Sequence, residues 1–479
     1  MKTNYALTVF TITALAFLAC GNPASRNELE TGNPYNILHY QPRTSYEINI
    51  TDGEAELKRG ATTAIYQYET GLPGGMIIVP SGEALRFNVT NSSVESTSLH
   101  WHGLRVPIEQ DGPSRVLNKG DTTVFEFTLN MTGTHWYHPH LRPILPQLNM
   151  GLYAPFIVKE DYDSKYAGDY VLTLDDWTLN PLSNAIDFDY GGVHGNMELI
   201  GNVETVNRRG VNAIYPVTLK QGEIVKLRFI NASTALSHTL SMDEHEFRVT
   251  HLDGHKLLEP YMTKTIRIAP GERVDVELKG IRDSGTYYIR NERSNGMKIP
   301  VIYEGVGEDM ESPFIPGESE AFPGIEGKSP DKVFVLGSDM DYDNGDGSHG
   351  SGSPVTAWTI NGKAFPQMDI FSCELNRVYI FRFDNQDNIG MAHHIRYHPM
   401  HLHGGHFQVV SVNGQPPDRE MWKDTLEIPP GTYIDVAVKF YYPGDWMLHC
   451  HIIDHEDGGM LTMVHVPDPS GGELPDHVM

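Results

Sequence analysis

Gly444-Asp445-Trp446-Met447-Leu448-His449 is the stretch that decides the fold, because the chain carries its pattern three times. The other copies stand at Gly133–His138 and Gly285–Arg290, so the leading glycines lie 152 and 159 residues apart. In each copy a second glycine precedes the first by 13 or 14 residues. Repetition at a fixed spacing indicates consecutive copies of one structural unit.

A second repeated pattern identifies the secondary structure of these units. Short apolar runs bounded by turn residues stand at Glu83–Val89, Ile224–Ile230 and Val378–Phe383, and long helical periodicity is hard to find. We therefore predict an all-β protein with three sandwich-sized domains. The predicted boundaries are 44–162, 163–325 and 326–468, after a linker at 20–43 and before a C-terminal tail at 469–479.

Composition narrows the class of protein. The 479 residues include 36 Lys and Arg against 62 Asp and Glu, a net charge of −26, which argues against nucleic acid or an anionic membrane surface as a partner and leaves cationic substrates open. Three cysteines, Cys20, Cys373 and Cys450, cannot build a disulfide framework. The 23 histidines instead suggest metal binding.

The N-terminus has the pattern of an export signal. Residues 4–19 are uncharged and follow Lys2, which predicts a signal peptide over 1–19 and a periplasmic or cell-envelope location. Cys20 directly after this apolar run resembles the lipidated cysteine of bacterial lipoproteins, and its lipidation would attach the protein to a membrane. An ordinary cleaved signal and a retained anchor are the alternatives.

Two further segments are predicted to lie outside the sandwiches. Glu304–Lys332 is rich in Gly, Pro and Glu and is predicted to be a linker, and Gly345–Ser353 is predicted to be a flexible insertion. The acidic residues around it do not match the spacing of an EF-hand, so we interpret them as a solvated loop rather than a calcium site. These residues are Asp339, Asp341, Asp343 and Asp346.

Histidines gather in four short clusters. The clusters are His100-Trp101-His102, His138-Pro139-His140, His398-Pro399-Met400-His401-Leu402-His403, and His449-Cys450-His451 followed by His455 and Met460. Side chains alternate along a strand, so His449 and His451 are expected on one face and Cys450 on the other. One tripeptide can therefore join two metal sites.

The two faces carry different ligands. A thiolate from Cys450, two imidazoles from His398 and His455 and a weak thioether from Met460 form the ligand set of a blue-copper electron-transfer site. The eight remaining histidines exceed the need of one copper and suit three, and they are expected to meet where the first and last repeats touch. They are His100, His102, His138, His140, His401, His403, His449 and His451. Zinc fits less well, because a closed zinc site needs four ligands.

These motifs, in this order, resemble those of the multicopper oxidases, over roughly residues 45–467. The resemblance implies three consecutive cupredoxin-like Greek-key β-sandwich domains and four copper ions. It places the type 1 copper on His398, Cys450, His455 and Met460, the type 2 copper on His100 and His401, and the two type 3 coppers on His102, His138 and His451 and on His140, His403 and His449. The middle repeat carries Arg290-Asn291-Glu292 at the corresponding position and is predicted to hold no copper.

The resemblance also implies a reaction. Four one-electron oxidations of a donor at the type 1 copper would supply the four electrons that reduce O2 to water, with Cys450 passing electrons to His449 and His451. Asp111 and Glu456 match the positions of acids that orient water or relay protons in this family. The alternatives are a turn-forming role for Asp111 and a solvated position for Glu456. Met460 as axial ligand predicts a moderate redox potential.

Neighbouring residues receive structural interpretations. Trp101, Trp136 and Trp446 are interpreted as packing residues that fix the ligand strands. His135, His393, His394 and His406 lack the spacing of ligands and are interpreted as structural or as supporting the ligands. Cys373 is interpreted as a buried, small apolar residue.

The electron donor is the least determined part of the prediction. Laccase-like oxidation of phenols and aromatic amines stands beside oxidation of Cu(I) or Fe(II), because no dense methionine cluster indicates a dedicated Cu(I) path. A non-catalytic copper-binding lipoprotein is the alternative from a different class, and it would need one copper site. Copper nitrite reductase is a further enzyme alternative, but the third domain counts against it.

Overall fold

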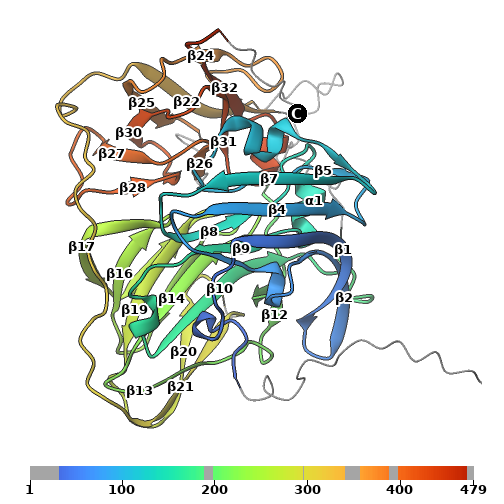
Figure 1. Cartoon of the computed structure of the whole chain (residues 1–479), viewed down its shortest axis with the longest axis vertical. Helices are drawn as coiled ribbons and strands as arrows, with labels where there is room; N and C mark the ends of the chain where they lie inside the picture. The colour runs from blue at the N-terminus through green and yellow to red at the C-terminus, as the bar shows by residue number, and fades with distance from the viewer. Residues whose placement is uncertain (1–31, 188–197, 295, 340–356, 388–396, 472–479) are drawn as a thin grey trace, which may run out of the picture.

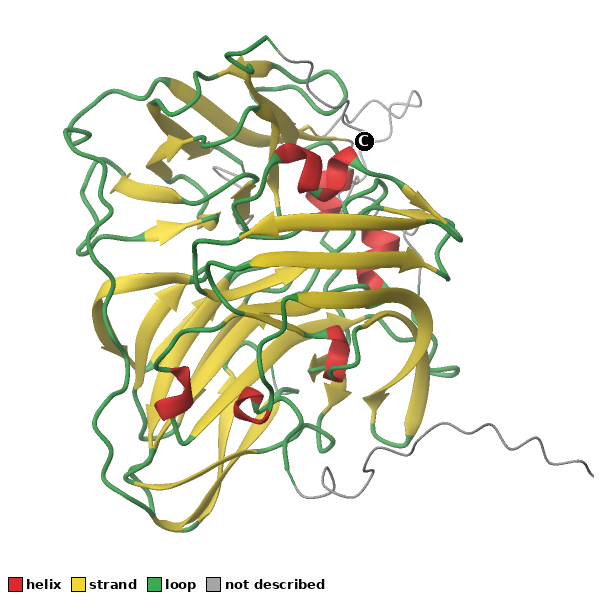
Figure 2. Ribbon diagram, in the orientation of Figure 1, coloured by secondary structure: helices red, strands yellow, loops and turns green. Residues whose placement is uncertain are grey.

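The computed structural model describes residues 32–187, 198–294, 296–339, 357–387 and 397–471. Strands dominate this part of the chain, and its few helices are short (Figures 1 and 2). The α-helices are α1 (Leu145–Asn149) and α2 (Ile453–Asp457); the 3-10 helices are η1 (Ile37–His39), η2 (Pro73–Gly75), η3 (Ile108–Gln110), η4 (Gly112–Ser114) and η5 (Asp163–Lys165). No helix in the described ranges has the length and apolar character needed to cross a membrane.

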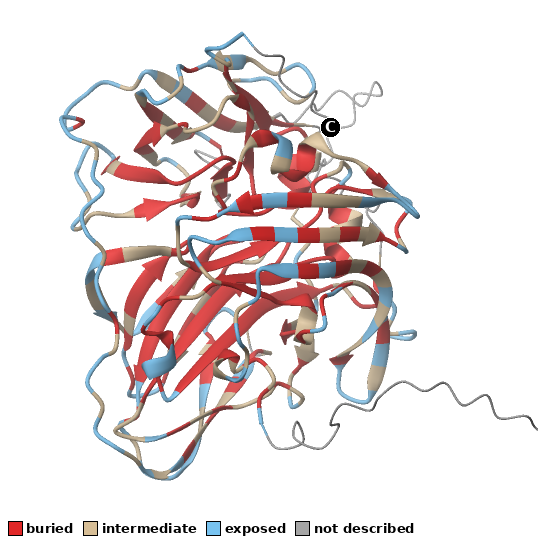
Figure 3. Cartoon of the chain, viewed as in Figure 1, coloured by how far each residue is buried: buried red, intermediate tan, exposed pale blue. Residues whose placement is uncertain are grey.

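The first unit contains strands β1–β9 and two main sheets, ordered β2-β1-β4-β7 and β3-β9-β8. Its strands are β1 (Ser45–Lys58), β2 (Ala61–Glu69), β3 (Ile77–Val79), β4 (Ala84–Asn91), β5 (Ser96–Thr97), β6 (Leu117–Asn118), β7 (Thr122–Thr128), β8 (Gly133–Tyr137) and β9 (Ala154–Val158). Buried and exposed residues alternate along β4, as expected for a sheet with one face on the core (Figure 3).

The middle unit contains β10–β21 in sheets ordered β12-β11-β10-β14-β19-β16-β17 and β13-β21-β20-β15-β18. Its strands are β10 (Gly168–Trp177), β11 (Val203–Val206), β12 (Arg209–Gly210), β13 (Val217–Gln221), β14 (Ile224–Asn231), β15 (His238–Met242), β16 (Phe247–Leu252), β17 (His255–Thr263), β18 (Thr265–Ile268), β19 (Arg273–Lys279), β20 (Gly285–Asn291) and β21 (Lys298–Val306). Strands β10 and β14 are buried along their whole length, unlike β4.

The third unit contains β22–β32 in sheets ordered β23-β22-β25-β30-β27-β28 and β24-β32-β31-β26-β29. Its strands are β22 (Lys332–Asp339), β23 (Ala357–Ile360), β24 (Ile370–Ser372), β25 (Val378–Asn385), β26 (His398–Leu402), β27 (Phe407–Val412), β28 (Trp422–Lys423), β29 (Thr425–Ile428), β30 (Tyr433–Lys439), β31 (Gly444–Cys450) and β32 (Leu461–Val466). Each unit thus has its own pair of sheets and its own apolar core, which confirms the all-β prediction with three sandwiches.

The two repeated patterns become corresponding strands. The first pattern forms β8, β20 and β31, and the second forms β4, β14 and β25. The predicted linker Glu304–Lys332 contains no strand except at its ends, where β21 runs to Val306 and β22 begins at Lys332. The predicted insertion at 345–353, together with Asp341, Asp343 and Asp346, lies outside the described residues, as do His393 and His394.

Candidate metal centre

A compact donor group lies inside the third unit, where β26, β31 and α2 meet. His398 begins β26, Cys450 ends β31 and His455 lies in α2. The Nδ1 atoms of His398 and His455 are 3.2 Å apart, and they lie 3.7 and 3.5 Å from the Cys450 sulfur. Since metal bonds to imidazole nitrogen and thiolate sulfur are about 2.0–2.3 Å long, three atoms this close can share one ion.

Backbone hydrogen bonds hold Met460 beside this group. The Cys450 N–H donates to the Met460 carbonyl at 3.1 Å, and the Met460 N–H donates to the His455 carbonyl at 2.8 Å. Met460 is fully buried and belongs to the same apolar core as Cys450. Burial also raises the pKa of the Cys450 thiol, so this sulfur is protonated unless a cation binds it.

Three residues beside this group were not predicted from the sequence. Trp358 stacks on the His455 ring with the centroids 3.5 Å apart. A carboxylate oxygen of Asp387 lies 3.4 Å from His398 Nε2, and one of Glu198 lies 3.6 Å from His455 Nε2. Trp358, Asp387 and Glu198 stand 97, 11 and 257 residues from the histidines they meet, and none of them belongs to one of the four histidine clusters that indicated the site.

The eight other histidines of the four clusters gather between the first and third units. Two of the pairs that join the two units are His100 with His401 and His140 with His449, each with Nε2 atoms 3.3 Å apart. Within the units, His403 and His449 approach to 3.2 Å, and His102 Nδ1 and His138 Nε2 to 3.4 Å. The His451 ring lies 5.0 and 5.4 Å from the rings of His102 and His138, measured between centroids.

The state of these imidazoles matches what copper requires. Burial lowers the pKa of seven of the eight, to about 3 for His138, so they are neutral and keep a lone pair. The other six are His100, His102, His140, His401, His403 and His451. Neither ring nitrogen of the buried His451 has a hydrogen-bond partner. Since unpartnered buried polar atoms are costly, facing lone pairs indicate a cation-binding site.

A glycine of the middle unit makes room for His451. Gly271 has φ +85°, and a Cβ atom there would lie 2.8 Å from the His451 ring. Another residue type would therefore push this imidazole away from its neighbours and would also be strained in the left-handed region.

Asp111 bridges histidines of the two units. Its Oδ1 accepts a hydrogen bond from His100 Nδ1 at 2.8 Å, and its Oδ2 accepts one from His403 Nδ1 at 3.1 Å. Oδ1 also accepts from the Gly112 N–H at 2.9 Å, so Asp111 forms a turn as well. Both bonds to histidine leave the Nε2 atoms directed at the donor group, as expected for an acid that orients metal ligands.

Glu456 is fully buried, so the alternative of a solvated acid is wrong. One of its oxygens lies 2.9 Å from His449 Nδ1 and the other 3.5 Å from His140 Nε2. Helix α2 therefore carries a residue toward each donor group: His455 toward Cys450, and Glu456 toward the eight histidines.

The remaining predicted residues have supporting positions. Trp101 lies in the core of the first unit, Trp446 lies in that of the third, and the Trp136 ring lies 4.4 Å from that of His138. His406 donates from Nε2 to the Asp253 carbonyl at 2.7 Å, and His135 Nε2 lies 3.3 Å from the Thr132 carbonyl. Cys373 is buried as predicted, and burial raises its pKa to about 11.

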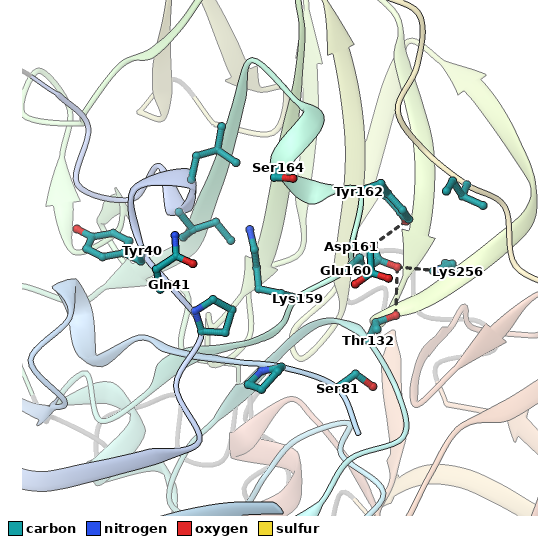
Figure 4. A pocket seen from close by; sticks show the side chains of 15 residues that line it. Tyr40, Gln41, Ser81, Thr132, Lys159, Glu160, Asp161, Tyr162, Ser164 and Lys256 are labelled. Atoms are coloured by element: carbon teal, nitrogen blue, oxygen red, sulfur yellow. Dashed lines mark hydrogen bonds and ion pairs between the residues drawn. The ribbon is translucent and has the colours of Figure 1, made fainter. Parts of the chain in front are cut away.

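A separate surface cavity of about 670 Å³ lies away from these groups (Figure 4). No histidine lines it, and its acid Glu160 accepts hydrogen bonds from Thr132 and Tyr162 and pairs with Lys256. This cavity does not contribute to the metal centre.

Comparison with known proteins agrees with the two donor groups. Family models described as multicopper oxidase match residues 49–163, 168–304 and 339–470. The chain belongs to the multicopper oxidase family. A multicopper oxidase of Staphylococcus epidermidis is 26% identical over 439 residues, which is 88% of each chain.

Solved structures of multicopper oxidases share the fold. A multi-copper oxidase from Pediococcus acidilactici superposes with a TM-score of 0.76 at 24% identity over 91% of this chain and 90% of that one. A laccase from the same species gives 0.74 at 25% identity over 88% and 90%. The prediction of three cupredoxin-like domains is confirmed, and the protein is an oxidoreductase that uses copper, O2 and an electron donor.

Proposed function

We propose that this multicopper oxidase holds four copper ions and couples four one-electron oxidations of an organic donor to the reduction of O2 to two waters. In this assignment His398, Cys450, His455 and Met460 hold the type 1 copper, and the eight histidines between the units hold three. The observation that carries the proposal is the tripeptide His449-Cys450-His451, whose middle residue faces one donor group while its neighbours belong to the other.

Copper supplies the one-electron redox chemistry, and the protein residues determine where it occurs. Cys450 is bonded through the backbone to His449 and His451, so the covalent bonds of one tripeptide connect the two donor groups. With phenols as donors, each of four phenol molecules loses one electron and the proton of its O–H group. O2 takes up these four electrons and four protons to give two waters, and four phenoxyl radicals leave.

Proton supply is the role proposed for the two buried acids. Glu456 lies between His449 and His140, and Asp111 lies between His100 and His403. Both carboxylates contact imidazoles from two different units. An acid in hydrogen-bond reach of the reacting region can transfer a proton there.

The surroundings of His398 support a phenol or aromatic amine as donor. A cavity of about 270 Å³ is lined by Tyr397, which precedes His398 in the sequence, and by Ile452, which follows His451. Its lining includes the apolar residues Ile200 and Leu236 and two arginines, Arg267 and Arg293, with Glu198 as its acid. Four apolar side chains of the lining can contact an aromatic ring, and the two arginines disfavour a metal cation, so the cavity suits an aromatic donor better than a hydrated cation.

Oxidation of Cu(I) or Fe(II) is the second candidate, and Glu198 favours it. The Glu198 side chain is 30% exposed and lies 3.6 Å from His455 Nε2, so it connects solvent with a ligand of the proposed type 1 site. A carboxylate there could attract a metal cation, and the net charge of −26 acts in the same direction.

Copper content and donor preference test the proposal. The loaded protein is expected to contain four coppers per chain, and one copper would favour a non-catalytic binding protein instead. O2 consumption is then compared for a phenol, Cu(I) and Fe(II) through their kcat/KM values. A metal ion preferred by more than about a hundredfold, about 2.7 kcal/mol, would overturn the organic donor.

We also propose export and lipid attachment through Cys20, which lies outside the described residues. The uncharged run at 4–19 before this cysteine supports it. Labelled palmitate should enter the wild type and not Cys20→Ser, and equal labelling would overturn the attachment.

A further inference from the structure

The middle unit contributes a fully buried guanidinium to the region behind the eight histidines. Arg273, the first residue of β19, uses all five of its N–H groups. Nε donates to the Thr134 carbonyl at 3.3 Å; Nη1 donates to the Gly271 carbonyl at 3.0 Å and to Asp424 Oδ1 at 2.7 Å; Nη2 donates to the Asp253 carbonyl at 3.0 Å and to Asp424 Oδ2 at 2.5 Å. One side chain thus binds residues of all three units.

Asp424 passes this contact on to the histidines. Its Oδ1 accepts a hydrogen bond from His102 Nε2 at 3.1 Å, and its carbonyl accepts one from His401 Nδ1 at 2.9 Å. The Thr425 hydroxyl donates to the same Oδ1 at 2.8 Å and lies 3.1 Å from His401 Nδ1. The bond at His102 Nε2 leaves its Nδ1 directed at His138, 3.4 Å away.

The charges of this pair compensate each other. Burial alone would raise the pKa of Asp424, but Arg273 beside it holds that pKa well below its usual range. The bidentate geometry also fixes the carboxylate plane, because both Asp424 oxygens are bound. Gly103 permits the approach, since a Cβ atom there would lie 2.2 Å from Arg273 Nη2.

We propose that Arg273 is a positioning residue of the middle unit that orients His102 through the Asp424 carboxylate. The middle unit, whose described residues contribute no side chain to the donor groups, then helps to orient the histidine cluster through Asp424. The inference rests on the proposed function, because it assumes that the eight histidines hold copper. It predicts weaker copper binding at the histidines and unchanged binding at Cys450.

Arg273→Lys tests the inference, with Arg228→Lys as the matched control. Arg228 is equally buried, binds Asp169 in bidentate fashion at 2.6 and 2.9 Å and reaches the Thr134 hydroxyl at 3.1 Å. It lies at the same junction of the first and middle units but has no hydrogen bond to the eight histidines. A lysine keeps the positive charge in both variants but lacks the planar guanidinium that binds both carboxylate oxygens.

The copper-loaded variants are titrated with a chelator while total copper and the blue thiolate absorption are followed. Arg273→Lys is expected to release copper other than the blue copper at a chelator concentration about tenfold or more below that of the wild type. Its blue absorption is expected to persist, and Arg228→Lys is expected to behave like the wild type. Melting temperatures show how far each substitution affects the whole fold.

Two outcomes would overturn the inference. Equal chelator resistance in Arg273→Lys and Arg228→Lys would show that Arg273 serves stability alone, and proportional loss of blue and other copper would show a general effect on the fold. If Arg273→Lys does not fold, Arg273→Gln/Asp424→Asn replaces the ion pair by a neutral hydrogen-bonded one and is judged by the same criteria. Wild type with fewer than four coppers would instead contradict the proposed function.

Discussion

Strands β26 and β31 of the third unit correspond to β15 and β20 of the middle unit, yet the two pairs surround different chemistry. Met400 pairs with Cys450 and Leu240 with Asn291, so the registers are identical. His238 therefore takes the place of His398, and Asn291 that of Cys450. The middle unit keeps one imidazole of the type 1 position and replaces the sulfur by an amide.

In the middle unit, hydrogen bonds satisfy the side chains at the positions that form the donor group in the third unit. Asn291 Nδ2 donates to His238 Nδ1 at 3.1 Å, and His238 Nε2 lies 3.0 Å from the Ser233 hydroxyl. Ser233 stands two residues after Asn231, as Asp387 stands two residues after Asn385, and both asparagines accept from that later residue's N–H. This framework therefore does not require a metal, because local hydrogen bonds can replace the donor group at the same position.

The largest effect is expected for Cys450→Asn, which gives the third unit the middle unit's residue. Blue absorption should vanish. Loss of a residue that supports a ligand lowers activity about 10–100-fold, and donor oxidation should fall further here because the substitution removes the ligand itself. The fold should persist, since an amide can donate to His398 as Asn291 does to His238. Absorption spectra, O2 consumption and thermal melting measure these effects.

Cys373→Ser is the matched control for that substitution, since Cys373 is also buried in the third unit but is not part of the donor group. It should keep both colour and activity. Blue absorption retained by Cys450→Asn would refute the type 1 assignment.

Asp387→Ser copies the residue that stands behind His238 and should have the next largest effect. Loss of the carboxylate 3.4 Å from His398 Nε2 should weaken copper binding at Cys450 by about 10–100-fold, measured by chelator competition. Asp384→Ser is the control, because Asp384 accepts from Gln386 on the same segment. Equal affinities in the two variants would mean that Asp387 does not support His398.

Asn291→Cys makes the opposite change and should create a weak additional metal site. The new thiol would stand beside His238 Nδ1 and the Glu204 carboxylate, which now lies 3.2 Å from Asn291 Nδ2. Copper-loaded variant protein titrated with Co(II) should bind one equivalent more than loaded wild type and show thiolate-to-cobalt absorption. Binding equal to that of the wild type would show that these three positions do not suffice without a second imidazole.

The smallest effect concerns acid stability and His238. Burial lowers the pKa of folded His238 to about 3, whereas an unfolded histidine has about 6.5, so the unfolded state binds the proton first. Stability is therefore lost as pH falls below 6.5, by about 2 kcal/mol at pH 5 for this residue.

His238→Gln should remove that part of the pH dependence in the copper-free protein. Denaturant unfolding at pH 7 and pH 5 measures the difference for variant and wild type. The same change in unfolding free energy between pH 7 and pH 5 in both proteins would mean that folding does not lower the pKa of His238.

The sequence could predict features that depend on local order. The three copies of the glycine-led strand gave β8, β20 and β31, and alternation around Cys450 anticipated two donor groups on opposite faces of one strand. The carboxylate bridges were predicted in part, because Asp111 and Glu456 stand in recognisable motifs. Their partners His403 and His140 follow from no local pattern.

The candidate donor residues could be identified from the sequence alone, because strand periodicity fixes which neighbouring side chains share a face. The environment of these residues depends on tertiary packing: Trp358 stacks on His455, Asp387 lies behind His398, and Arg273 lies behind His102 through Asp424. These contacts join residues up to 322 positions apart. Their partners are chosen by the packing of whole sheets against one another, and that packing leaves no signal in local residue spacing.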